Sequence, residues 1–158
     1  MSRLQEVVSP PDRIEADLAV VFFEPATVAP DGPAGLFDCR LGGVLADHLR
    51  STEGGRLEQR LLVRSSGRIA SPWVLFFPLA KVGVEPPQDC LAEAVDTALD
   101  AGFGCLAMAP PVERWPDREY WLGALQEILG RPEKSALECL VTFNRSYLHD
   151  HAAAVFNL

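Results

Sequence analysis

The chain has 158 residues, of which 48% are hydrophobic and 23% charged, and its formal net charge is −8. This composition is typical of a folded globular domain with a packed core and excludes a disordered chain. The acidic excess argues against nucleic acid as a partner, because non-specific binding of a polyanion depends on Lys and Arg at its phosphates.

The apolar runs are far shorter than the roughly 20 residues that a membrane-spanning helix requires, so we expect no membrane partner. The segment Met1–Pro11 is polar and lacks the basic-then-apolar pattern of a secretory leader, which predicts a cytoplasmic protein. We expect a single domain over residues 1–158, with residues 1–12 flexible.

The first strong signal is the apolar run Leu18–Phe23, which predicts a buried strand ending at Glu24. After a loop rich in Pro and Gly, Asp38 is placed to cap a helix. The apolar stripe of this helix consists of Leu41, Val44, Leu45 and Leu49. Gly42 and Gly43 in its first turns indicate either a close approach to another backbone or a weak helix.

Leu57–Val63 and Trp73–Leu79 read as a pair of strands. The second does not alternate, which predicts that both of its faces are covered. A helix starting near Pro87 and ending at Gly102 follows, because proline is tolerated in a first turn and glycine favours a helix end. Cys105–Ala109 is predicted to be a short buried strand.

Asp117 is placed to cap a third helix that ends at Gly130. Its apolar stripe consists of Trp121, Leu122, Leu125, Ile128 and Leu129. Glu138–Phe143 is the last predicted strand, and Ser146–Phe156 a short terminal helix. The order β-α-β-β-α-β-α-β predicts an α/β fold with a mixed, largely parallel sheet and helices on both faces.

Few side chains suggest catalysis or metal binding. The sequence has four cysteines and no C-x-x-C pair, so we expect core or half-buried thiols: Cys39, Cys90, Cys105 and Cys139. In His149-Asp150-His151 the imidazoles would point about 200° apart on a helix, which favours a solvated tail over a metal site. His48 is expected to flank its helix stripe, and a solvated helix face is expected for Glu93, Asp96 and Asp100. We therefore expect no catalytic residue, no metal and no cofactor.

The loop after the Cys105–Ala109 strand is the most interesting segment, because ligands of open α/β sheets bind outside the carboxyl ends of strands. Glu113, Arg114 and Trp115 offer an acid, an anion-binding guanidinium and a stacking surface. Asn144 and Arg145, after the last strand, can lie at the same edge. These five residues are the candidate ligand site. The alternative is a rigid Pro-rich connection in which Trp115 covers the start of the third helix.

Several of these segments resemble the N-terminal domain of the leucyl aminopeptidases (peptidase family M17). Asp17–Phe23 resembles its opening strand, Phe37–Leu45 its first helix, and Leu61–Leu75 the strand pair that follows. Glu138–Asn144 and Tyr147 are similar to the closing strand and helix of macro domains, a related fold. The resemblance implies a macro-domain-like, three-layer α/β/α architecture.

The sequence also departs from both families. Nothing in it matches the metal-binding catalytic domain of the aminopeptidases, so no catalytic residue carries over. The macro-domain site for ADP-ribose requires a glycine-rich loop whose amides approach the diphosphate. The corresponding stretch Ala109–Pro116 has no glycine, and three prolines remove amide donors, so ADP-ribose is disfavoured.

The leading hypothesis is a non-catalytic interaction, assembly or regulatory module that forms a homo-oligomer or docks onto a separate protein chain. The alternative is a macro-like binder of a nucleotide or another small anionic ligand at the strand-end loops. An enzyme is the least favoured class, because no convergent set of acid, base and nucleophile can be assembled from the sequence.

Overall fold

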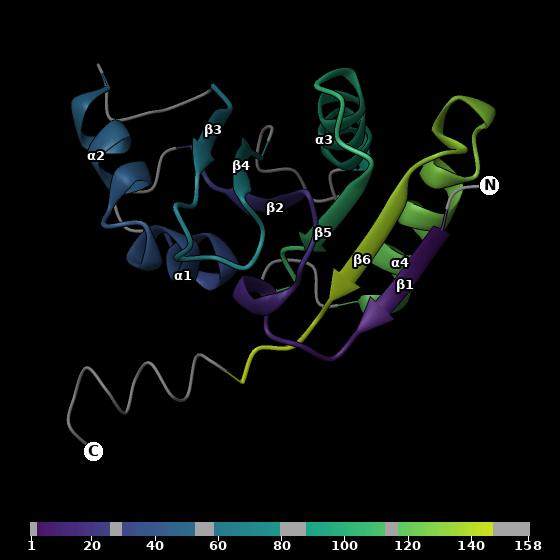
Figure 1. Cartoon of the computed structure of the whole chain (residues 1–158), viewed down its shortest axis with the longest axis horizontal. Coiled ribbons are helices and arrows are strands. Elements are labelled where there is room, and N and C mark those ends of the chain that lie inside the picture. The colour runs from purple at the N-terminus through teal and green to yellow at the C-terminus, as the bar shows by residue number, and fades with distance from the viewer. Residues whose placement is uncertain (1–2, 26–29, 53–58, 80–87, 113–116, 147–158) are drawn as a thin grey trace.

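The computed structural model describes residues 3–25, 30–52, 59–79, 88–112 and 117–146. Within these ranges, six strands form one mixed sheet with the order β1-β6-β5-β2-β4-β3 (Figure 1). The strands are β1 (Arg3–Val7), β2 (Leu18–Phe23), β3 (Leu61–Arg64), β4 (Trp73–Pro78), β5 (Cys105–Ala109) and β6 (Glu138–Thr142). The helices are α1 (Gly32–Arg40), α2 (Val44–Ser51), α3 (Gln88–Asp100) and α4 (Arg118–Leu129).

All neighbouring strands of the sheet are parallel except β3, which is antiparallel to β4. The carboxyl ends of β1, β6, β5, β2 and β4 therefore lie along one edge of the sheet. The central strand β2 pairs with β4 on one side and with β5 on the other. Every residue of β2 is buried, as its continuous apolar run predicts.

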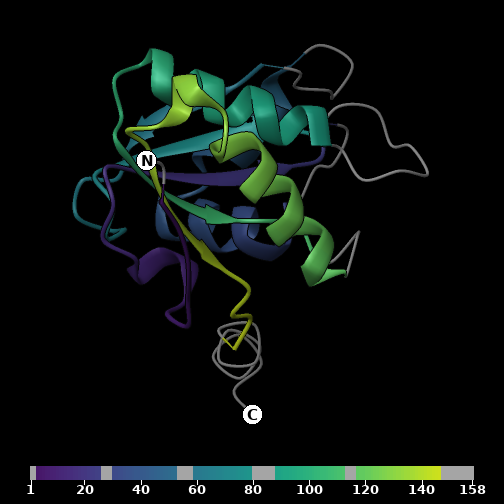
Figure 2. The same ribbon diagram turned by 90° about the vertical axis from the view of Figure 1, so that its right-hand side faces the viewer.

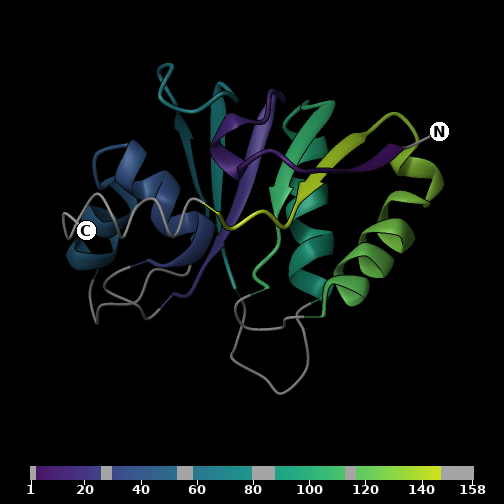
Figure 3. The same ribbon diagram turned by 90° about the horizontal axis from the view of Figure 1, so that it is seen from below.

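Helices cover both faces of the sheet, which confirms the predicted three-layer α/β/α architecture (Figure 3). Alternate residues of β2 divide between the two cores. Val20 and Phe22 pack with residues of α3 and α4 on one face, which Figure 2 shows in front of the sheet. Val21 and Phe23 pack with residues of α1 and α2 on the other face.

The expectation that residues 1–12 are flexible is wrong for part of this segment. Arg3–Val7 forms the edge strand β1, which pairs with β6 in parallel register from Arg3–Glu138 to Val7–Thr142. A short 3-10 helix at Pro11–Arg13 follows. The strand is difficult to detect from the sequence because three of its five positions are exposed, so it lacks the apolar run that marks the inner strands.

The predicted helix that begins at Asp38 is two helices. Asp38 lies inside α1, and α2 starts only at Val44. Gly42 and Gly43 between them have φ of +79° and +85°, in the left-handed region that glycine adopts readily. Apart from the chain neighbours, no backbone atom of the described residues lies within 4 Å of a Cβ built at either glycine, and at Gly43 such a Cβ would meet none of their atoms. The glycine pair therefore turns the chain, and of the two alternatives from the sequence, the close approach to another backbone is not found among the described residues.

The remaining helices follow their sequence signals closely. The Asp117 carboxylate accepts the N–H groups of Glu119 and Tyr120 at 3.1 and 3.3 Å, so Asp117 is the N-cap of α4 as predicted. Gly102, with φ +92°, follows the end of α3 and donates its N–H to Leu99 at 3.0 Å. The predicted start of this helix at Pro87 and the predicted terminal helix 146–156 lie largely outside the described residues.

Candidate ligand-binding site

The connections that leave the carboxyl edge diverge around β2. The chain leaving β2 reaches α1 on one face of the sheet, whereas the chains leaving β4 and β5 reach α3 and α4 on the opposite face. Adjacent strands whose connections go to opposite faces leave a crevice at their carboxyl ends, where ligands of α/β sheets bind. The divergence makes this edge the candidate site.

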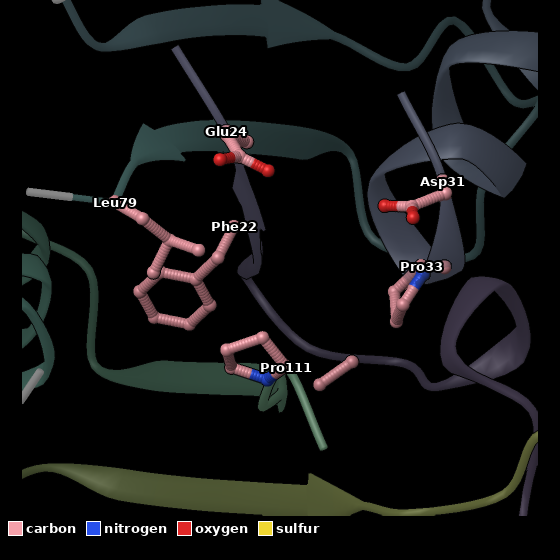
Figure 4. Close-up of a pocket in the computed structure, with 8 residues that line it drawn as sticks. Phe22, Glu24, Asp31, Pro33, Leu79 and Pro111 are labelled. Carbon is pink, nitrogen blue, oxygen red and sulfur yellow. The ribbon is translucent and has the colours of Figure 1, made fainter. Parts of the chain in front are cut away.

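A pocket lies in this crevice (Figure 4). The empty volume of the pocket is about 530 Å³, and this figure includes the part that is open to solvent. The described residues that line it come from the ends of β2, β4 and β5 and from the start of α1: Phe22, Glu24, Asp31, Gly32, Pro33, Leu79, Ala109 and Pro111. The pocket thus combines segments that are widely separated in the sequence.

The strand ends at the pocket are held by backbone and aromatic contacts. Leu79 donates its N–H to the carbonyl of Phe23 at 2.9 Å, which extends the pairing of β2 and β4 one residue beyond the end of β4. The ring of Phe22 packs edge-on against Phe77 with centroids 6.1 Å apart. Phe22 and Leu79 are both buried, so they form a fixed apolar wall.

The start of α1 forms the opposite side of the pocket. Asp31 is the N-cap and Pro33 lies in the first turn, a position where proline costs no hydrogen bond. Gly35 donates its N–H to the carbonyl of Asp31 at 3.0 Å. A Cβ on Gly35 would lie 2.5 Å from the carbonyl oxygen of Pro30, so only glycine permits this tight entry into the helix.

Two carboxylates, those of Glu24 and Asp31, face the pocket from β2 and α1 (Figure 4). Asp31 is exposed and makes no side-chain cap bond to α1, and Glu24 is half-buried. Among the described lining residues none is basic. The described lining is therefore apolar at Phe22, Leu79 and Pro111 and includes two acidic side chains, those of Glu24 and Asp31.

Asn144 lies at the predicted edge, where it contacts its own chain. Its side-chain amide donates to the carbonyl of Val8 and its Oδ1 accepts the N–H of Ser146 at 2.8 Å. The hydroxyl of Thr142 donates to the carbonyl of Ser9 at 2.7 Å. These bonds tie the carboxyl end of β6 to the chain leaving β1.

Arg145 joins two strand ends at the same edge. Its guanidinium donates to the carbonyl of Pro110, after β5, at 2.6 Å and to that of Asn144 at 3.3 Å. The structure thus brings Arg145 beside the loop that the sequence singled out. The other three candidates of that loop, Glu113, Arg114 and Trp115, lie outside the described residues, so the five-residue site stays a prediction.

The described residues contain no group of three or more His, Cys, Asp or Glu side chains that could hold a metal ion. His149-Asp150-His151 lies outside them. His48 is exposed on α2, where Nδ1 contacts the carbonyl of Val44 at 2.8 Å. No helix in the described part of the chain has the length and hydropathy to cross a membrane.

The cysteines differ in exposure. Cys90 and Cys139 are buried and Cys105 is half-buried, as expected, whereas Cys39 is exposed near the end of α1. The prediction that all four are core or half-buried is therefore wrong for Cys39, because it falls on the outer side of a helix that the sequence did not reveal. Burial raises the pKa of the Cys139 thiol to about 12, with the Cys105 sulfur as a second cause.

The predicted solvated face of α3 is only partly solvated. Glu93 and Asp100 are exposed, but Asp96 is half-buried and binds Lys134 at 2.6 Å. The Lys134 side chain is only 5% exposed. Its hydrogen bond to Asp96 raises the pKa of Lys134 above the ordinary 10.5, although burial acts in the opposite direction. This pair connects α3 to the segment between α4 and β6.

The pocket residues were not among the sequence candidates. Their sequence signals are weak: Glu24 directly follows a buried strand, and Asp31-Gly32-Pro33 is a helix start, with a capping residue before a proline. Nothing local connects these residues to Leu79 or Pro111. The pocket residues come together because of the strand order, which could not be read from the sequence.

Solved structures of macrodomains share this fold. The macrodomain of Thermus aquaticus DarG superimposes with a TM-score of 0.64 at 16% identity, covering 90% of this chain and 99% of its own. The IBV X-domain gives a TM-score of 0.65 at 13% identity over 98% and 97% of the two chains. The Trypanosoma brucei macrodomain in complex with ADP-ribose gives 0.62 at 14% identity over 97% and 69%.

No family model and no curated protein matches the sequence. At these identities the structural likeness shows the fold alone. The macro-domain-like architecture implied by the sequence resemblance is therefore confirmed, and a relation to the leucyl aminopeptidases in particular is not established by these similarities.

Proposed function

We propose that this protein binds a small ligand of the nucleoside or nucleotide class in the pocket between α1 and the ends of β2, β4 and β5. The observation that carries the proposal is the position of the pocket, at the point where the connections from adjacent parallel strands go to opposite faces. A concave site with an apolar wall and few polar groups is the usual form of a small-molecule site.

The similar structures support this ligand class. The Trypanosoma brucei macrodomain was solved in complex with ADP-ribose and in complex with ADP. Both ligands contain adenosine, and the fold they occupy is the fold of this chain. The similar structures therefore support the alternative hypothesis from the sequence, a macro-like binder of a small anionic ligand, more than the hypothesis of an assembly module.

Thermal unfolding with adenosine, AMP, ADP and ADP-ribose tests the proposal. A ligand present at 100 times its Kd stabilises the folded state by about 2.7 kcal/mol. For a domain of this size that corresponds to a rise in Tm of roughly 5–10 °C. If none of the four compounds raises the Tm at saturating concentration, the proposal is wrong.

A pair of variants tests whether the ligand binds in this pocket. Pro111→Trp adds a large ring at the pocket wall and should abolish the shift. Pro72→Trp makes the same replacement at the amino end of β4, on the opposite edge of the sheet, where the residue is exposed. The control should keep the shift; equal loss in both variants would contradict the assignment.

The narrower hypotheses from the sequence stay predictions. These are the relation to the N-terminal domain of leucyl aminopeptidases, assembly with itself or with a separate chain, the absence of enzymatic activity and the cytoplasmic location. The similar structures named above are macrodomains, and none is an aminopeptidase. A strict monomer in light scattering that retains no partner in a pull-down would exclude assembly.

A further inference from the structure

We propose that Arg145 is a positioning residue of the pocket: its guanidinium holds the loop after β5 so that the ring of Pro111 forms a fixed wall of the ligand site. The inference rests on the proposed function and adds to it a residue that acts through the wall. It follows from three observations: the turn at Pro111, the hydrogen bonds of Arg145 and the anchoring of the chain that carries Arg145.

The loop after β5 makes a tight turn at the pocket. The N–H of Val112 donates to the carbonyl of Pro110 at 2.8 Å, which closes a γ-turn with Pro111 at its centre. A proline ring holds φ at about −65°, which suits the centre of an inverse γ-turn. The ring of Pro111 therefore has a defined place in the lining of the pocket (Figure 4).

The carbonyl of Pro110 is the point at which Arg145 holds this turn. Nη2 of Arg145 donates to this carbonyl at 2.6 Å, and Nη1 of the same guanidinium donates to the carbonyl of Asn144 at 3.3 Å. A donor that carries a positive charge makes a stronger hydrogen bond than a neutral donor does. The oxygen that closes the turn at Pro111 is therefore also fixed from the end of β6.

The chain that carries Arg145 is itself anchored. The side-chain amide of Asn144 donates to the carbonyl of Val8, and the hydroxyl of Thr142 donates to the carbonyl of Ser9 at 2.7 Å. The N–H of Asn144 in turn donates to the hydroxyl oxygen of Thr142 at 3.2 Å. The guanidinium therefore extends from a backbone that is held in place at the end of β6.

The contact between Arg145 and the loop lies next to the pocket. The residues that line the pocket from the end of β5 are Ala109 and Pro111, which lie on either side of Pro110 in the sequence. Arg145 is half-buried and is not one of the described lining residues. Without the guanidinium, Pro111 should be able to move relative to the buried ring of Phe22. A displaced wall weakens the contacts that a ligand makes there, with or without phosphate groups on that ligand.

Isothermal titration of Arg145→Met tests the inference with the same four compounds, adenosine, AMP, ADP and ADP-ribose. We expect each compound that binds the wild-type protein to bind about tenfold more weakly, the effect of losing one charge-assisted hydrogen bond. The ratios between the affinities should not change. If Arg145 instead contacted a phosphate, only the compounds with phosphate groups would lose affinity, and that result overturns the inference.

A double-mutant cycle tests whether the effect of Arg145 passes through Pro111. Pro111→Ala removes the ring from the wall. If Arg145 acts by placing that ring, adding Arg145→Met to Pro111→Ala should weaken binding by less than about twofold. A loss in the double variant equal to the product of the two single losses would mean that Arg145 acts elsewhere, and it overturns the inference.

Arg118→Met is the matched control. Arg118 also joins elements near this edge, because its guanidinium pairs with Glu6 of β1 and lies 5.6 Å from the centroid of the Phe143 ring. The control should bind the four compounds within about twofold of the wild-type protein, since exposed ion pairs contribute little. Urea unfolding checks that both variants are folded during the titration. Equal weakening in both would indicate a general loosening of the edge and overturns the inference.

Arg145→Lys is a second variant, which keeps a charged donor and loses the planar fork of the guanidinium. Its affinity for adenosine should lie between those of the wild-type protein and Arg145→Met. An affinity no better than that of Arg145→Met would contradict the role of the charged donor.

The outcomes separate this inference from the proposed function. Unchanged binding of every compound by Arg145→Met overturns the inference and leaves the proposed function standing. Absence of binding of all four compounds by the wild-type protein overturns the proposed function, and this inference with it.

Discussion

The carboxylate of Asp38, inside α1, accepts the backbone N–H of Leu45, in the first turn of α2, at 2.6 Å. Its second oxygen accepts the N–H of Ala46 at 3.2 Å. Gly43 occupies the N-cap position of α2 and has no side chain to perform this task. Asp38 therefore caps a helix that begins after its own helix has ended, and it fixes the angle between them.

Replacing Asp38 with alanine should lower the free energy of unfolding by about 1–2 kcal/mol, because two N–H groups of α2 lose their partner. Asp38 is only 6% exposed, so water reaches the orphaned groups poorly. Urea unfolding measures the loss. Asp47→Ala, an exposed position of α2 whose carboxylate pairs with Arg50, should change stability by less than about 0.5 kcal/mol. Similar losses in both variants would exclude the capping role.

Two Gly→Ala substitutions should act in opposite directions. Gly43→Ala forces an L-residue to φ +85° and should destabilise by about 1–2 kcal/mol, although, chain neighbours aside, the described residues leave open space around the new methyl group. Gly123→Ala, at an exposed position of α4 with equal space, should stabilise by about 0.5–1 kcal/mol through helix propensity. Thermal melts of the two variants compare them directly. A stabilising Gly43→Ala would show that the chain does not need the left-handed turn.

The Lys134–Asp96 pair predicts a dependence of stability on alkaline pH. The folded state raises the pKa of Lys134 above 10.5, so this contribution is fully present below pH 10.5 and is lost as the pH rises through the raised value. We expect the stability difference between the wild-type protein and Lys134→Met to be constant from pH 7 to 9 and to shrink above pH 10.5. Urea unfolding at each pH measures it, and a difference that grows with alkaline pH would contradict the sign.

Removing the charge of Asp96 and removing that of Lys134 should not lower the free energy of unfolding by the same amount. Asp96→Asn leaves an ammonium group 5% exposed, and among the described residues Glu133, at 3.7 Å, is the acidic partner that remains. Lys134→Met leaves a carboxylate that is half exposed and reaches water. We therefore expect Asp96→Asn to cost about 1–3 kcal/mol and more than Lys134→Met, measured at pH 7. The reverse order would show that packing of the lysine stem outweighs its charge.

Thiol labelling should distinguish the cysteines by exposure. In the native protein Cys39 should react rapidly with a disulfide reagent at pH 8, and Cys139 should not react, because it is buried and its pKa is about 12. Cys39→Ser should abolish the rapid phase. In denaturant all four thiols should react. A rapid phase that survives Cys39→Ser would contradict the placement of Cys39.

The inner part of the fold could be predicted from the sequence because its signals are local. Three of these signals affect only residues close to them in the sequence. They are the apolar run of β2, the carboxylate of Asp117 before α4 and the glycine at position 102. β1 and α1 were missed for the opposite reason: β1 is a mostly exposed edge strand, and α1 is a nine-residue helix with two glycines and a proline. Their stability comes from the neighbours on which they pack.

For this chain, neighbouring residues were sufficient to predict an α/β protein with a buried central strand and several helix ends. The pocket could not be predicted from neighbouring residues. Phe22, Asp31, Leu79 and Pro111 meet because β2 pairs with both β4 and β5 while their connections go to opposite faces. Strand order depends on pairing between distant segments, whose free energy is settled by the packing of the whole sheet and not by local propensity.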